Sequence, residues 1–85
     1  MDEFNPDDAL REIAIFLQRW FPPEIAPLVV KKQLQATGAV MDNLTEEDIR
    51  LLLSRIQRVI LPSFLSTSEA RKEIMSLKKR LGLKF

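Results

Sequence analysis

Apolar residues recur at intervals of three and four positions through most of this chain, and the pattern breaks at Pro22, Gly38 and Pro62. This spacing places apolar side chains on one face of an α-helix, and no segment shows the strict alternation of a strand. Proline removes a backbone donor and glycine readily adopts left-handed conformations, so these breaks are typical of helix ends. The sequence therefore predicts an all-α fold, a compact bundle of four helices at about 6–21, 24–37, 46–61 and 67–81.

The first and third predicted helices have strong start signals and similar apolar faces. Asn5 is a good N-cap before Pro6, and Thr45 caps a first turn of acidic residues that complement the helix dipole. The residues expected to face inward are Leu10, Ile13, Ala14, Leu17, Trp20 and Phe21 in the first helix, and Ile49, Leu52, Leu53, Ile56, Val59 and Ile60 in the third.

The second predicted helix starts among prolines. Because Pro27 is tolerated only in a first turn, the regular part of this helix is expected to begin near Ala26 and to end before Gly38. We expect its inward-facing apolar residues to be Ile25, Leu28, Val29 and Leu34.

The fourth predicted helix is bounded by clear signals at both ends. Ser66 and Glu69 have the spacing of a capping box, and Gly82 is placed to end the helix. Its apolar face is narrow, about 60° wide. This a/d spacing suits a helix that pairs with another chain as well as one that packs on its own domain. The residues of this face are Ala70, Ile74, Leu77 and Leu81.

Length and composition indicate one small domain covering residues 1–85. No apolar run approaches the roughly 20 residues that a membrane span requires. The first residues are acidic, where a signal peptide would be basic, and the chain has no cysteine. We therefore expect a soluble, cytoplasmic protein without disulfides that does not bind a membrane.

Charge is distributed unevenly along the chain. Residues 1–48 carry ten acids and four bases, a net charge of −6, whereas residues 49–85 carry two acids and nine bases, a net charge of +7. Such asymmetry lets a basic half meet an acidic partner or nucleic acid, or lets the two halves complement each other within one fold. The sequence leaves both alternatives open.

The chain lacks the residues that most enzymes need. It has no histidine, cysteine or tyrosine, and two glycines cannot build a phosphate-binding loop. Glu46, Glu47 and Asp48 are adjacent on a helix start, where successive side chains point apart, so they are better explained as partners of the helix dipole. We expect no enzymatic activity, no cofactor, no bound metal and no small-molecule substrate.

A protein partner, or a second copy of the chain, is the leading hypothesis for what it binds. Ile15, Leu51 and Met75 fall well off the apolar faces of their helices. Single exposed apolar residues are normal, so these three are only candidates for an interface. Leu77 and Leu81 join them, because the fourth helix has the spacing of a dimerising helix.

Nucleic-acid binding is the alternative hypothesis. The acidic start of the third helix would repel phosphates, so a reading helix there is not favoured. Basic residues of the C-terminal half would instead give salt-sensitive binding that depends little on sequence. These basic residues are also explained without any ligand, as the solvated face of the last helix. The candidates for anion contact are Arg50, Arg55, Arg58, Arg71, Lys72, Lys78 and Lys79.

The segment Leu44-Thr45-Glu46-Glu47-Asp48-Ile49 resembles one found in sterile alpha motif domains, which also place a glycine shortly before it and a basic helix after it. The resemblance implies a helical module that self-associates or binds partners, in some cases RNA. The predicted third helix runs on to Ile60, however, and the glycine-containing link of that family is missing. No residue role is carried over from it.

Overall fold

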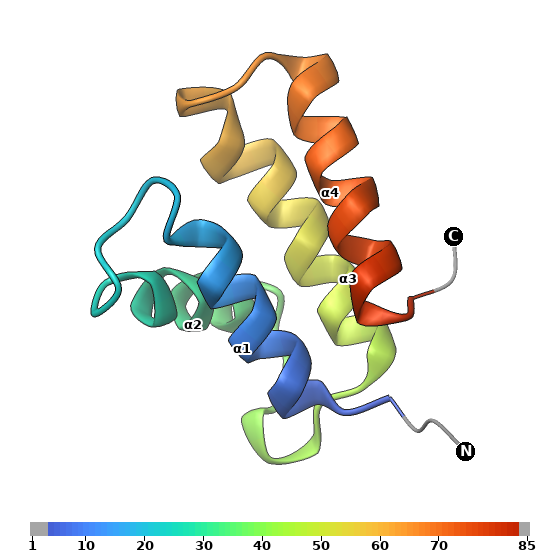
Figure 1. The fold of residues 1–85 in the computed structure, drawn as a ribbon. Helices are drawn as coiled ribbons and strands as arrows, with labels where there is room; N and C mark the ends of the chain where they lie inside the picture. The colour runs from blue at the N-terminus through green and yellow to red at the C-terminus, as the bar shows by residue number, and fades with distance from the viewer. Residues whose placement is uncertain (1–3, 84–85) are drawn as a thin grey trace.

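The structure, a computed structural model that describes residues 4–83, contains four α-helices and, within those residues, no strand (Figure 1). Asp2, Glu3 and Lys84, which contribute to the charge asymmetry, lie outside the described residues. The α-helices are α1 (Pro6–Leu17), α2 (Ala26–Ala36), α3 (Glu46–Arg55) and α4 (Thr67–Leu81). Shorter helical turns flank α3, namely the 3-10 turns η1 (Met41–Asn43) and η3 (Leu61–Ser63) and the π-helical turn η2 (Ile56–Ile60). The all-α prediction is confirmed.

The helices pack into a body of 34 × 25 × 22 Å. In Figure 1, α3 and α4 run side by side and α2 crosses near α1. Helix α1 packs most extensively against α2 and also touches α3 and α4, while α2 also packs against α3. Helix α1 therefore contacts each of the other three α-helices, and α2 and α4 lie at the periphery of the bundle.

The core is formed where these helices meet. The apolar faces predicted for α1, α3 and α4 supply most of the buried side chains, as expected for amphipathic helices. The fully buried large side chains are Ile13, Leu17, Leu34, Ile49, Leu52, Leu53, Ile56, Leu61, Ile74 and Leu77.

The predicted helix starts have the expected hydrogen bonds. The side chain of Asn5 accepts from the backbone N–H groups of Asp7 and Asp8. The capping box of α4 is formed, since Glu69 N–H donates to the Ser66 hydroxyl at 3.2 Å and Ser66 N–H donates to the Glu69 carboxylate at 3.1 Å. Helix α3 begins with an equivalent box, whose members are Thr45 and Asp48. These caps satisfy donors that would otherwise be unpaired.

Helix α4 ends as predicted, whereas α1 ends earlier than expected. Gly82 has φ +77°, a left-handed conformation, and the N–H of buried Leu83 donates to the carbonyl of Lys78. The regular part of α1 stops at Leu17, and residues 18–20 form turns before Pro22. Pro22 has no N–H to donate to the carbonyl of Gln18, four residues before it, and its ring would clash with that carbonyl, so a regular helix cannot continue through these residues.

Part of the predicted face of α2 is wrong. Ile25 is 39% exposed and Leu28 is 60% exposed. The core instead takes the row formed by Ala26, Val30 and Leu34, which is spaced by four residues. Helix α2 and its first turn carry more apolar residues than one face can bury, so the residues predicted to face inward are not all the ones that do.

The end of the third helical segment also departs from the prediction. Val59 is 47% exposed, although its position continues the apolar face of α3. The turn Ile56–Ile60 is π-helical and therefore wider than an α-helical turn. The extra residue in that turn rotates the face, so Ile56 stays in the core and Val59 points outward.

Candidate interaction groove

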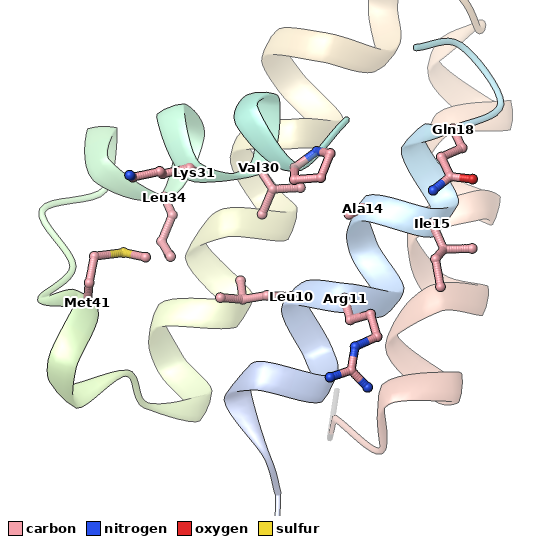
Figure 2. Close-up of a pocket in the computed structure, with 10 residues that line it drawn as sticks. Leu10, Arg11, Ala14, Ile15, Gln18, Val30, Lys31, Leu34 and Met41 are labelled. Carbon is pink, nitrogen blue, oxygen red and sulfur yellow. The ribbon is translucent and has the colours of Figure 1, made fainter. Parts of the chain in front are cut away.

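An apolar groove of about 410 Å³ lies between α1 and α2 (Figure 2). Seven of the ten residues that line it are apolar. In Figure 2, Val30 and Leu34 of α2 point toward α1, where Leu10 and Ala14 lie opposite. The groove is therefore a gap between two packed helices.

The wall on α1 follows from helical spacing. Arg11, Ala14, Ile15 and Gln18 are separated by three or four residues, so they form one ridge along the helix, and Leu10 lies beside it. Ala14 contributes only a methyl group to the floor of the groove. A larger residue at this position would fill the space between the helices, so the groove is open at the point where the chain has alanine.

The wall on α2 is built in the same way. Pro27, Val30, Lys31 and Leu34 are also spaced by three or four residues, and Met41 of η1 closes one end. Pro27 lies at the helix start, where its missing N–H leaves no backbone donor unsatisfied. Both walls thus present side chains on regular helices with satisfied backbones.

The charges at the rim of the groove are both positive. Arg11 and Lys31 are its only charged lining residues, and they stand on opposite sides of it in Figure 2. Arg11 lies 3.5 Å from Asp8, but both side chains are more than half exposed, so water screens this pair. Within residues 4–83, Lys31 forms no salt bridge. The groove therefore combines an apolar floor with cationic edges.

The five residues predicted for a protein interface are not brought together. Ile15 is 50% exposed and lines the groove, whereas Leu51 lines a separate hollow and exposed Met75 lies on α4. The prediction that Leu77 belongs to an interface is wrong, because this side chain is 1% exposed and lies in the core. Leu81 is partly buried against that core. The a/d row of α4 is thus occupied within its own domain.

The seven basic candidates fall into two groups. Arg50 and Arg55 are engaged internally, because Arg50 lies 3.5 Å from Glu46 and the Nε of Arg55 donates to the Gln33 side chain at 2.9 Å. Arg55 and Arg58 line the same hollow as Leu51, beside the end of α2. On α4, the side chains of Arg71, Lys72 and Lys79 are exposed. The side chain of Lys78 is half-buried.

Direct contacts do little to neutralise the basic half of the chain. Within residues 4–83, the one ion pair between distant segments joins Arg19 of the acidic half to Glu73 of the basic half at 2.6 Å. The pair joins a base from the acidic half to an acid from the basic half, so it leaves the net charge of each half without a partner of opposite sign. It ties the end of α1 to α4, where Arg19 also lies over the ring of Trp20. Among the described residues, the basic side chains of α4 form no salt bridge.

Sequence reasoning found one residue of the groove and missed its partners. Ile15 was detected because it falls off its apolar face, but Leu10, Ala14 and Leu34 were expected to be ordinary core residues. The available signal was Ala14, a small residue in the middle of an apolar face. By itself that signal is weak, since alanine is also the best helix former.

No protein-family model, curated protein or solved structure matches this chain. The resemblance to sterile alpha motif domains is thus limited to the start of α3. Among the described residues, no cluster of His, Cys, Asp or Glu is arranged to hold a metal ion. None of the helices described is both long enough and apolar enough to cross a membrane.

Proposed function

We propose that this chain is a non-catalytic module that binds a protein partner through the groove between α1 and α2. The observation that carries the proposal is an open apolar groove flanked by the exposed side chain of Ile15. Apolar surface that a domain leaves uncovered in a concave site is typical of a binding surface. A cytoplasmic location is part of this proposal.

The chemistry of the groove favours binding over catalysis. The groove contains no carboxylate, and Arg11 and Lys31 are its only ionisable lining residues. The chain as a whole has no histidine or cysteine. General acid–base or nucleophilic chemistry would therefore need groups that this surface does not offer.

The proposal is tested by site-specific cross-linking. Because the chain has no cysteine, a single Gln18→Cys substitution places one photo-activatable label at the groove. Ser76→Cys, at an exposed position on α4, is the matched control. In extract from the native host, we expect the label at position 18 to give a discrete adduct that the label at position 76 does not give. Equal adducts from both positions, or none from either, would contradict the proposal.

Self-association through α4 is a narrower version of the same function. It would have to use the outer face of the helix, where Met75 lies among Arg71, Lys72 and Lys79. Two copies of this face repel each other, and salt weakens that repulsion. Sedimentation at rising concentration and rising salt tests this version, and a strictly monomeric protein under all conditions discards it.

Nucleic-acid binding is a second candidate, favoured by the exposed basic residues of α4, which form no salt bridge among the described residues. About three or four phosphate contacts would give binding that weakens steeply with salt. Titration with duplex and single-stranded oligonucleotides at low salt tests this candidate. Replacing Arg71, Lys72 and Lys79 by glutamine is expected to abolish such binding and to leave cross-linking at position 18 unchanged.

A further inference from the structure

The groove limits the backbone conformation of whatever fills it. Its walls are α-helices, whose backbone groups are hydrogen-bonded within each helix, so it offers no strand edge with which an extended peptide could pair. None of its lining residues is aromatic, whereas grooves that bind polyproline segments are lined by aromatic rings. An occupant must therefore satisfy its own backbone hydrogen bonds, as a helix does.

The dimensions of the groove suit a short stretch of helix. The wall on α1 extends from Leu10 to Gln18, about 12 Å along the helix axis at 1.5 Å per residue. Apolar side chains at positions i, i+4 and i+7 of a partner helix cover about the same length. The volume of about 410 Å³ lies within the range of roughly 300–1,000 Å³ found for ligand-binding pockets.

The rim charges specify the polar face of that helix. Arg11 and Lys31 stand on opposite sides of the groove, and no acidic residue lines it. A helix lying between them would bring residues flanking its apolar row close to both cations. Acidic flanking residues would be attracted there and basic ones repelled, which is how charge selects among partners with similar apolar faces.

A second copy of this chain is a poor fit to the same groove. The outer face of α4 carries Arg71, Lys72 and Lys79, and the outer face of α2 carries exposed Ile25 and Leu28 beside Lys32. Either helix would place further cations beside Arg11 and Lys31. Helices α1 and α3 each expose a single large apolar side chain, Ile15 and Leu51, and so offer no apolar row. Charge and the lack of an apolar row together favour a partner from another chain.

We infer that the groove between α1 and α2 binds an amphipathic helix of another protein, with acidic residues flanking its apolar row. This inference rests on the proposed function and adds the chemistry of the partner. Arg11 and Lys31 select the partner, and the exposed apolar residues of the lining, Ile15, Pro27 and Met41, supply most of the contact area.

Two synthetic peptides of about 18 residues test this inference, a length at which a helix can form in isolation. Both carry the same row of leucines at i, i+4 and i+7. One has glutamates and the other lysines beside the row. Fluorescence anisotropy at low salt is expected to show the glutamate peptide binding roughly five- to tenfold more tightly, and the difference should shrink at about 0.5 M salt.

Charge-reversed variants make the test specific to the rim. In the double variant Arg11→Glu/Lys31→Glu, the preference is expected to invert toward the lysine peptide. Lys72→Glu, which makes the same kind of change at an exposed position on α4, is the control and should keep the preference for glutamate. Circular dichroism verifies that each variant is folded.

The possible results separate this inference from the proposed function. Equal affinity for both peptides, or a preference that the double variant leaves unchanged, overturns the assignment of an acidic partner. Failure of both peptides to bind also overturns it, while a cross-link at position 18 would still support the proposed function. Loss of the cross-link together with failure of both peptides removes both.

Discussion

Helices α2 and α4 both lie at the periphery of the bundle, but they differ in how their sequences define them. Helix α4 has a capping box at Ser66, a left-handed glycine at its end and one narrow apolar row. Helix α2 has no side-chain cap, begins beside Pro27, and carries apolar residues on more than one face. The bounds of α4 were predicted to the residue, whereas the inward face of α2 was partly wrong.

This difference shows where the chain leaves apolar surface uncovered. A helix with one narrow apolar row buries that row and presents polar residues outside, as α4 does with Ile74 and Leu77. A helix with surplus apolar residues cannot bury them all against one neighbour. In α2 the buried row, with Val30 and Leu34, lines the groove, while the surplus leaves Leu28 exposed, so the less well-defined helix is the one that borders the proposed binding site.

The largest expected effects come from truncating core residues in either helix. Leu77→Ala in α4 and Leu34→Ala in α2 are each expected to lower the free energy of unfolding by about 2–5 kcal/mol, because both side chains are fully buried. Leu28→Ala, the control, should change it by less than about 0.5 kcal/mol. Urea denaturation measures all three. A large loss in Leu28→Ala would show that the assigned faces of α2 are reversed.

Removing the N-cap residue should destabilise α4 more than α2, by an amount smaller than the loss of a core side chain. Ser66→Ala is expected to cost about 0.5–2 kcal/mol, since the hydroxyl satisfies the N–H of Glu69. The equivalent change in α2, Ile25→Ala, removes no capping hydrogen bond and should cost less. Thermal unfolding of the two variants gives this comparison directly. Equal losses would mean that the cap contributes nothing specific to α4.

The capping box also makes α4 sensitive to acid. Hydrogen bonds from the backbone and hydroxyl of Ser66 lower the pKa of Glu69 below its ordinary value of 4.5. The stabilisation is therefore fully present above pH 4.5 and is lost as the pH falls through the lowered pKa. Glu69→Gln keeps the spacing of the box but removes the titrating charge, so unfolding in urea should depend less on pH below 4.5. An unchanged pH profile in this variant would contradict the assignment.

The smallest effect on stability should accompany a large effect on binding. Ile15→Gln replaces an exposed apolar side chain at the edge of the groove by a polar, uncharged one, so the free energy of unfolding should change by less than about 0.5 kcal/mol. The same change should abolish binding of the glutamate-flanked peptide. A matched Leu51→Gln variant, similarly exposed but outside the groove, should bind normally. Similar behaviour of the two variants would show that position 15 has no special role.

The sequence predicted the fold well because local signals and periodicity agreed. Caps at Asn5, Thr45 and Ser66 located three helix starts, and the apolar rows of α1, α3 and α4 identified most of the core. The errors arose where a position has two physically acceptable environments. Ile25 and Leu28 could face inward by composition alone, and only the packing of α2 against α1 decides that they do not.

The candidate groove was much less predictable than the fold. A groove between helices is a property of two faces together, and its open volume depends on how closely α1 and α2 approach above Ala14. Periodicity identifies the face of each helix but not the distance between them. Ile15 could be detected because a single side chain off the apolar face is apparent from the periodicity of one helix. That Arg11 and Lys31 face the same groove depends on how α1 and α2 pack, which the sequence pattern does not give.

The central claim is that an acidic amphipathic helix docks between α1 and α2. The most direct test is an NMR titration of the isotope-labelled protein with the glutamate-flanked peptide, following every assigned backbone amide. The account predicts saturable shifts concentrated in residues 10–18 and 27–34, with little change in residues 70–80. Shifts centred on residues 70–80, or no shifts at a large excess of peptide, would contradict it.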